Sequence, residues 1–218
     1  MTQQGWSKDE MARRVAERLK PGSFVNLGIG MPASVVAAVD PEDGIVFHCE
    51  NGIVGYRALE LDEQPDPATI DAGSAPVGLI PGASIVALDQ SFAIARGGRL
   101  DVTVLGAFQV SEKGDLANWK APQADLAGIG GAMDLAAGAN EVFVMMRHTE
   151  RSGALKIVRE CTYPLTAPRC VTTIVTEYAV MRVTPTGLTV EQLADGVDRA
   201  FLQSVTEPEL SFAELVTA

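Results

Sequence analysis

The stretch that decides the fold is SFVNLGIGMPASVVAAVDPEDGIVFHCENG, residues 23–52. Two apolar runs within it, SFVNLGIG (23–30) and GIVFHC (44–49), are typical of buried strands, and the first runs into a glycine-containing turn. Pro32 lies between them and suits the first turn of a helix, where its missing amide hydrogen would have no partner. The order strand, helix, strand is typical of neighbouring parallel strands joined by a crossover.

The same alternation continues on both sides of this stretch. Residues 7–20 are expected to form an amphipathic helix, with Ser7 and Glu10 placed for a capping box. Further strands are expected at 83–89, 101–110, 141–146, 154–161 and 170–183. Further helices are expected at 90–98, after the glycine-rich turn in 128–139, and at 189–205 with Thr189 as N-cap. These nearly continuous apolar strands predict an α/β fold, with an open, mostly parallel sheet flanked by helices in a single domain over residues 1–218.

Composition and charge exclude several classes of function. The chain has 218 residues, 47% of them hydrophobic, and a formal net charge of −11, which disfavours nucleic acid and anionic membranes as partners. No uninterrupted apolar run reaches 18 residues, and charges stand near the N-terminus where a secretory signal would be apolar, so a cytoplasmic protein is expected. Three cysteines without C-x-x-C spacing and two widely separated histidines predict neither a disulfide framework nor a metal site.

Three segments are expected to meet where a ligand would bind. In an open parallel sheet, ligands lie beyond the carboxyl ends of the strands, and GIGMP (28–32), CENGIVG (49–55) and GIGGAMD (128–134) should arrive there. The two glycine-rich turns would let the backbone approach a ligand closely and present N–H groups to an anion. The third segment supplies a carboxylate, Glu50, which is suited to nucleophilic catalysis beside such donors.

Each of these features also has a structural explanation. Glycine-rich turns precede helices in many α/β folds, and a glutamate before Asn-Gly can be a solvated turn residue. His48 and Glu50 would share one face of a continuing strand, with Cys49 on the other as a small core residue. His148 is expected at the surface, at the end of a strand.

The ordered motifs resemble those of the B subunit of class I coenzyme A-transferases, the 3-oxoacid type. The chain is similar to the 3-oxoadipate and acetoacetate:succinyl-CoA transferase B subunits, over about residues 7–205. The resemblance is carried by NLGIGMP (26–32), ENGIVG (50–55), SFAIARGG (91–98), LGAFQVSEKGDLANW (105–119), GIGGAMDL (128–135), CTYPLT (161–166) and the run from Cys170 to Val180.

The resemblance implies a CoA-transferase fold and a reaction that moves CoA from an acyl-CoA to a free carboxylic acid. It implies that Glu50 is the nucleophile, and that the oxyanion or substrate is held by a set of backbone and amide groups. That set is Asn51, Gly130, Gly131, Gly28 and Gly30. No cofactor is implied beyond the CoA thioester substrate, and the expected partner is the CoA-transferase A subunit, in an A2B2 heterotetramer. For Asn51, a role in the turn that presents Glu50 and a role as a donor both stay open.

Three positions depart from the family pattern. Cys49 stands where members commonly have Ser, and Ser74 stands where they carry the Lys of an AGK motif. The family's GP after ENGIVG is replaced by YRALE, in which Arg57 is a candidate for a compensating charge.

The expected reaction is transfer of CoA from succinyl-CoA to a 3-oxo acid, with 3-oxoadipate as the first choice of acceptor and acetoacetate as the second. Two alternatives to this reaction remain open. One is a CoA-thioester hydrolase or a C–C bond-cleaving enzyme on the same fold. The other is a non-catalytic subunit that stabilises a partner.

Overall fold

The computed structural model describes residues 5–121, 128 and 130–213. Within them, one sheet has ten strands in the order β13-β12-β11-β10-β8-β5-β1-β2-β3-β4, and a second sheet has three in the order β7-β6-β9. The strands are β1 (Phe24–Leu27), β2 (Val46–His48), β3 (Ile53–Arg57), β4 (Gly78–Ile85), β5 (Val102–Leu105), β6 (Gln109–Ser111), β7 (Leu116–Ala117), β8 (Glu141–Met145), β9 (Ile157–Val158), β10 (Val171–Val175), β11 (Ala179–Thr184), β12 (Gly187–Leu193) and β13 (Leu210–Phe212). The helices are α1 (Lys8–Ala16), the 3-10 helices η1 (Pro32–Ala37) and η2 (Pro41–Asp43), α2 (Leu88–Arg96), α3 (Ala132–Gly138) and α4 (Arg199–Ser204).

Parallel strands form the middle of the large sheet. The pairs β10-β8, β8-β5, β5-β1 and β1-β2 are all parallel, and antiparallel strands extend the sheet on both sides. The predicted open, mostly parallel sheet flanked by helices is therefore confirmed. Because the carboxyl ends of these central strands lie at one edge, the loops that follow β1, β2, β5 and β8 meet there.

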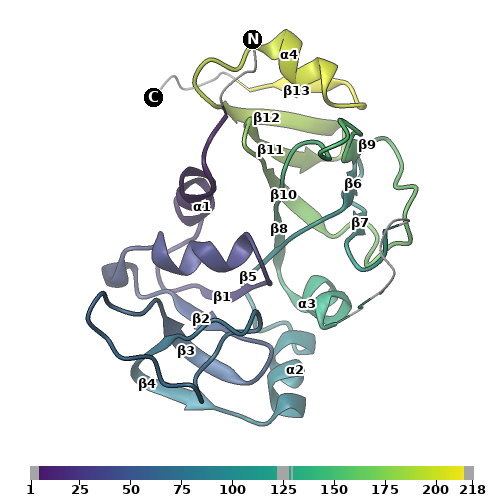
Figure 1. Ribbon diagram of the computed structural model, residues 1–218. Coiled ribbons are helices and arrows are strands. Elements are labelled where there is room, and N and C mark those ends of the chain that lie inside the picture. Colours follow the sequence, from purple (N-terminus) through teal and green to yellow (C-terminus); the bar gives the residue numbers. More distant parts are fainter. Residues whose placement is uncertain (1–4, 122–127, 129, 214–218) are drawn as a thin grey trace.

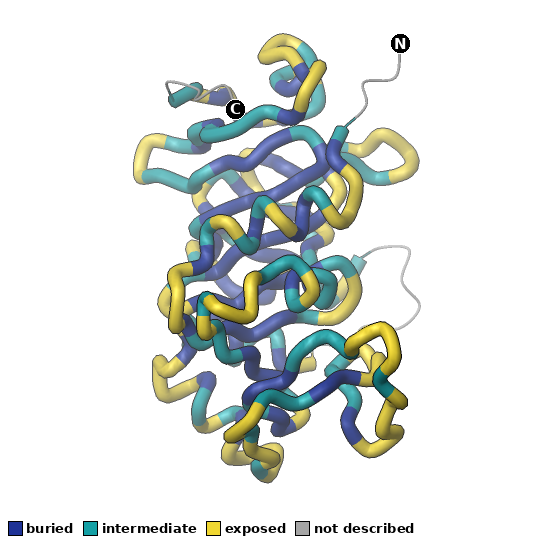
Figure 2. Tube along the Cα trace, turned by 90° about the vertical axis from the view of Figure 1, so that its left-hand side faces the viewer, coloured by how far each residue is buried: buried dark blue, intermediate teal, exposed yellow. Residues whose placement is uncertain are grey.

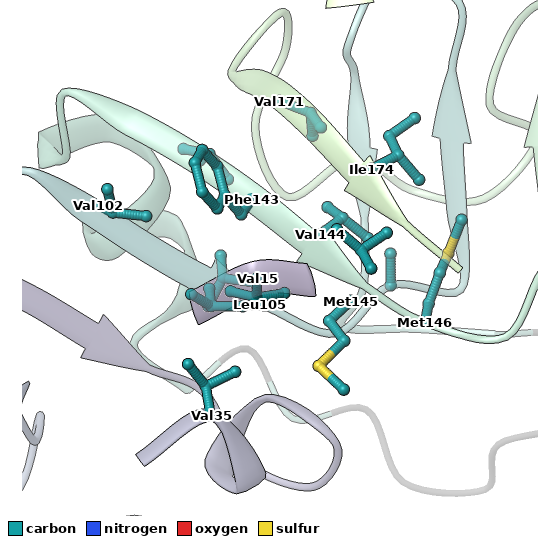
Figure 3. Packing of buried hydrophobic residues seen from close by; sticks show 14 of the residues in the cluster. Val15, Val35, Val102, Leu105, Phe143, Val144, Met145, Met146, Val171 and Ile174 are labelled. Carbon is teal, nitrogen blue, oxygen red and sulfur yellow. The ribbon is translucent and has the colours of Figure 1, made fainter. Parts of the chain in front are cut away.

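Helices cover both faces of the sheet. In Figure 1, α1 and η1 lie on one side of it, and α3 and the small β7-β6-β9 sheet lie on the other. Figure 2 shows the strands mostly buried behind helical turns whose outer surfaces are exposed. Side chains of the helices pack against the central strands in one hydrophobic core, with Val15 of α1 and Val35 of η1 on the helices and Phe143 on strand β8 (Figure 3). Each such buried side chain contributes roughly 1.5–3 kcal/mol relative to an exposed one.

The first helix begins as predicted. Ser7 Oγ accepts a hydrogen bond from the backbone N–H of Glu10 at 3.2 Å, and Glu10 Oε2 accepts one from the N–H of Ser7 at 2.7 Å. The capping box is therefore confirmed, although the helix ends at Ala16 rather than at residue 20.

The prediction for residues 189–205 is wrong in its first part. Residues 187–193 form β12, which pairs with β11 and β13, and Thr189 lies in this ladder opposite Arg182. The helix begins only after Asp198, whose carboxylate accepts a hydrogen bond from the N–H of Phe201 at 2.7 Å. The physical reason is a period of two, since Leu188 and Val190 are buried while Thr189 between them and Glu191 after them are half-buried.

Other boundaries differ because of local breaks. The strand expected at 170–183 is divided into antiparallel β10 and β11 by a turn in which the N–H of Thr176 donates to the carbonyl of Ala179 at 2.9 Å. The strand expected at 101–110 ends at Leu105, and its last residues join the small sheet as β6. The strand expected at 154–161 is reduced to β9, the one at 83–89 ends at Ile85, and the helix after Pro32 is a 3-10 helix.

Candidate active site

A cavity of about 400 Å³ opens at the carboxyl ends of the central strands. The loops after β1, β2, β5 and β8 and the start of α3 contribute to its wall, as the topology requires. Its lining residues are Gly28, Ile29, Met31, Pro32, Glu50, Leu105, Gly106, Ala107, Phe108, Asn118, Gly128, Gly130, Gly131, Ala132, Leu135, Met145, Met146, Arg147 and Lys156. Leu105, Met145 and Met146, which Figure 3 shows beside the ends of β5 and β8, make much of this wall apolar.

Glu50 enters the cavity from a tight turn between β2 and β3. The N–H of Cys49 donates to the carbonyl of Ile53 at 2.8 Å, and the N–H of Gly52 donates back to the carbonyl of Cys49 at 3.0 Å. Gly52 has φ +115°, and a Cβ atom on it would collide with the carbonyl oxygen of Val86. Glycine is therefore required at this position, and the turn holds Glu50 against the end of β2.

Gly131 lies directly against the Glu50 carboxylate. A Cβ atom built on Gly131 would stand 2.5 Å from Glu50 Oε2 and 2.8 Å from a ring carbon of Phe92. Gly131 is also the residue before the first turn of α3, and Gly130 beside it has φ +52°. Neither glycine donates its N–H to another described residue, so both amides are available to a ligand beside Glu50.

The other predicted binding residues are placed differently. Gly28 lines the cavity, but its N–H already donates to the carbonyl of Val104 at 2.8 Å. Gly30 is exposed and is not among the lining residues. Asn51 also lies outside the lining, because its side-chain amide donates to the carbonyl of Ile70 at 2.7 Å and ties the loop before β4 to the turn. The structure thus brings together Glu50, Gly28, Gly130 and Gly131 in the cavity wall. Ile129, which directly precedes Gly130, lies outside the described residues.

Burial changes the acid–base behaviour of the two adjacent residues. Burial raises the pKa of Glu50 above its ordinary value of 4.5, because the apolar wall disfavours the charged form. Burial also raises the pKa of Cys49, whose side chain is only 1% exposed. Cys49 is therefore a protonated core residue, as predicted.

A buried polar network lies beneath the turn. The amide nitrogen of Asn26 is 3.1 Å from both the carbonyl oxygen and Nδ1 of His48. Since this nitrogen can only donate, Nδ1 accepts and the proton resides on Nε2, which donates to Ser91 Oγ at 2.9 Å. Ser91 in turn donates to the carbonyl of Cys49 at 3.2 Å. Burial lowers the pKa of His48 to about 4, so the network is neutral and holds the residue that precedes Glu50.

Sequence reasoning missed two cations of the cavity wall. Arg147 follows β8, and Lys156 precedes β9. The position of Arg147 directly after an expected strand could have indicated it, by the same rule that placed Glu50. Lys156 carried no such signal, because it lay inside an expected strand.

Two further expectations are tested by the geometry. The prediction that His148 lies at the surface is wrong, because the residue is fully buried. Its Nδ1 atom lies 2.9 Å from the hydroxyl oxygen of Thr176, and its Nε2 atom lies 2.9 Å from that of Thr206. Arg57 is engaged elsewhere, with Nη1 2.6 Å from Glu63 Oε2, and does not line the cavity. Its position therefore gives no support to a compensating charge in this cavity.

Two kinds of feature are absent from the described residues. They contain no group of three or more His, Cys, Asp or Glu side chains arranged to hold a metal ion. No helix in this part of the chain is long and apolar enough to cross a membrane.

Comparison with known proteins gives consistent matches. A family model described as Coenzyme A transferase matches residues 8–204. The chain is 45% identical over 201 residues to the B subunit of 3-oxoadipate CoA-transferase from Pseudomonas putida, covering 92% of this chain and 94% of the relative. It is 39% identical to the B subunit of succinyl-CoA:3-ketoacid coenzyme A transferase from Helicobacter pylori, covering 93% and 97%. Among solved structures, an acyl-CoA transferase of Escherichia coli O157:H7 matches with a TM-score of 0.77 at 19% identity, over 96% of this chain and 42% of that longer chain.

Proposed function

The chain belongs to the coenzyme A transferase family, and from that premise we propose that it is the B subunit of an enzyme that moves CoA between a carboxylic acid and a 3-oxo acid. The observation that carries the proposal is the position of Glu50, half-buried in the wall of an apolar cavity and in contact range of Gly131. A desolvated carboxylate with a raised pKa is a stronger nucleophile than one in water, because less hydration must be removed before it attacks.

The proposed reaction passes through two exchanges at Glu50. The carboxylate attacks the thioester carbon of the acyl-CoA, expels the CoA thiolate and becomes a mixed anhydride. The thiolate then attacks the glutamyl carbonyl, releases the first acid and leaves a glutamyl-CoA thioester. The second acid repeats these steps in reverse order. Because the nucleophile has the same chemistry as the substrates, each step is nearly neutral in energy, and ping-pong kinetics follow.

Each attack places negative charge on a carbonyl oxygen, which needs a donor. The N–H groups of Gly130 and Gly131 have no acceptor among the described residues, and Gly131 lies directly beside the Glu50 carboxylate. A preorganised donor of this kind contributes roughly 3–4 kcal/mol to the transition state. The apolar wall made by Leu105, Met145 and Met146 serves to keep water from the anhydride and the thioester.

The proposed substrates are succinyl-CoA and 3-oxoadipate, with acetoacetate as the second choice of acceptor. The Pseudomonas relative is named for 3-oxoadipate, and the Helicobacter relative for succinyl-CoA and a 3-ketoacid. Both relatives are named as the B member of a multi-subunit enzyme, which supports a CoA-transferase A subunit in the role of partner, in the proposed A2B2 assembly.

The proposal is tested by trapping the enzyme intermediate. The complex of this chain with its A-type partner is mixed with succinyl-CoA without acceptor, then treated with borohydride, which reduces a glutamyl thioester to an alcohol. Peptide mass spectrometry should find this change at Glu50, and Glu50→Gln should abolish it. The matched control is Glu42→Gln, because Glu42 is exposed on η2 and away from the cavity.

The other outcomes select the alternatives. Loss of succinyl-CoA with no trapped thioester indicates a hydrolase, and absence of any reaction indicates a non-catalytic subunit. Either result would overturn the proposed transfer.

A further inference from the structure

The charges of the cavity wall are unevenly distributed. Among its described lining residues, the charged side chains are Glu50, Arg147 and Lys156. Glu50 follows β2, whereas Arg147 follows β8, and β1 and β5 lie between these strands in the sheet. The wall therefore carries one carboxylate at one end and two cations at the other.

Lys156 is a partly buried cation without a close partner. Within the described part of the chain, its ammonium group has no hydrogen bond and no carboxylate within ion-pair distance. Burial lowers its pKa, while the more distant Glu177 and Glu150 act in the opposite direction. Glu150 accepts a hydrogen bond from the hydroxyl of Tyr163 at 3.0 Å. A half-buried ammonium facing a cavity is stabilised when an anion enters it.

Arg147 is also only weakly paired. Its Nη1 atom lies 3.8 Å from Glu177 Oε1, and its side chain is 59% exposed. The other oxygen of Glu177 accepts a hydrogen bond from the N–H of His148 at 2.8 Å. Glu177 is not among the lining residues of the cavity, so it pairs with Arg147 from outside. The remaining N–H donors of the Arg147 guanidinium can bind a second carboxylate, which guanidinium groups bind well.

The spacing between the two ends fits a short diacid. Neighbouring strands are about 4.8 Å apart, so the three intervals from β2 to β8 separate Glu50 from Arg147 by roughly 14 Å at the level of the backbone. An extended chain rises about 3.5 Å per three bonds, so the five C–C bonds of a six-carbon diacid span roughly 6 Å. The side chains of Glu50 and of the two cations reach inward across the remaining distance.

We propose that Arg147 and Lys156 bind the distal carboxylate of a dicarboxylic substrate while its reacting carboxyl group lies at Glu50. The pair makes the enzyme selective for four- to six-carbon diacids over monoacids of the same length. This inference rests on the proposed transferase function and names the residues that choose its substrate class. The same cations would also suit a phosphate of CoA, and the experiment distinguishes the two sources of the anion.

The test compares two acceptors of equal length. Wild type and the variants Arg147→Gln and Lys156→Met, each in complex with the A-type partner, are assayed with acetoacetyl-CoA as donor and succinate or butyrate as acceptor. Loss of a hydrogen bond between charged groups reduces kcat/KM for succinate by roughly ten- to a hundredfold, while kcat/KM for butyrate and KM for acetoacetyl-CoA stay unchanged. Lys156→Arg should retain the preference for succinate.

The matched control is Arg151→Gln, which removes the same charge from an exposed residue outside the cavity wall. If both acceptors are affected equally, or if KM for acetoacetyl-CoA rises instead, the cations bind CoA and the inference is overturned. A wild-type enzyme that prefers butyrate would overturn it as well. Arg147→Gln changes an exposed side chain, so it gives an answer even where Lys156→Met fails to fold. Formation of the borohydride-sensitive thioester at Glu50 is measured in parallel, because its absence in wild type would indicate failure of the proposed function itself.

Discussion

The Oε2 atom of Glu50 lies 2.5 Å from the position that a Cβ atom on Gly131 would occupy. Real Cβ atoms do not approach an oxygen this closely, so even the smallest side chain at residue 131 would displace the carboxylate or the turn before α3. Glu50 and Gly131 come from segments about eighty residues apart and are brought together by the parallel strands between them. Gly131 has an ordinary φ of −88°, so the glycine is required by the carboxylate and the Phe92 ring beside it, not by the backbone conformation.

Gly131→Ala is expected to lower kcat by about 100-fold, because a displacement of about 1 Å of a reacting group has an effect of that size. The measurement is CoA transfer from succinyl-CoA to 3-oxoadipate by the complex with the A-type partner. Gly106→Ala is the control, since it adds the same methyl group to the same cavity with no described atom within 4 Å. A Gly131→Ala enzyme with the kcat of wild type would contradict the assigned geometry.

The pH dependence of the reaction should report the burial of Glu50. Because burial raises the pKa of Glu50 above 4.5, the nucleophile becomes protonated, and inactive, at a higher pH than an exposed glutamate would. The acid limb of kcat/KM for succinyl-CoA is therefore expected to have an apparent pKa above 4.5. His48 has a pKa of about 4 and does not account for this limb. A limb at or below 4.5 would argue against Glu50 as the titrating nucleophile.

Much of the site could be predicted because parallel strands impose where their ends lie. Once residues 23–52 are identified as strand, helix and strand, the turns after them must meet at one edge, and Gly28, Glu50 and Gly131 do. This rule needs only the order of the elements, which the apolar runs reveal.

Features that depend on distant packing could not be predicted in this way. The run TVEQL (189–193) is compatible with a helix, and only its pairing with β11 and β13 makes it a strand. His148 is buried because Thr176 and Thr206, from other parts of the chain, satisfy both ring nitrogens. Asn51 turns from the cavity because the carbonyl of Ile70 accepts from it.

The two histidines should make the folded chain less stable in mild acid. Burial lowers the pKa of both His48 and His148 to about 4, against an ordinary value of 6.5. The unfolded chain therefore binds more protons between these values, so the stability is fully present above about pH 6.5 and declines as the pH falls toward 4. From pH 7 to pH 5 the free energy of unfolding is expected to fall by about 3–4 kcal/mol through these two residues.

Urea unfolding of wild type and His148→Gln at pH 5 and pH 7 measures this effect. Glutamine can keep polar contacts with Thr176 and Thr206 but does not titrate, so the variant should lose about half of the pH dependence. An unchanged dependence in His148→Gln would show that other groups are responsible. The comparison cancels the carboxylates, because they are the same in both proteins.

Ser74 offers a test of the position where the resemblance to the family leads us to expect a lysine. Its loop reaches the cavity, since a Cβ atom on the neighbouring Gly73 would lie 3.6 Å from Ile29, which lines the wall. Ser74 already has φ +65°, so a lysine there adds little backbone strain beyond that of serine. Ser74→Lys would place a cation near the cavity of an otherwise acidic chain, where it could attract the anionic CoA of the proposed substrate.

We expect Ser74→Lys to lower KM for succinyl-CoA about two- to fivefold with kcat unchanged, the range of an exposed ion pair. The gain should decrease as salt is raised from about 0.01 M to about 0.15 M, because the shorter Debye length screens it. Ser204→Lys, on the exposed side of α4, adds the same charge away from the cavity and should leave KM unchanged. Equal effects of both variants would mean that net charge, and not the position of residue 74, controls the affinity for the acyl-CoA.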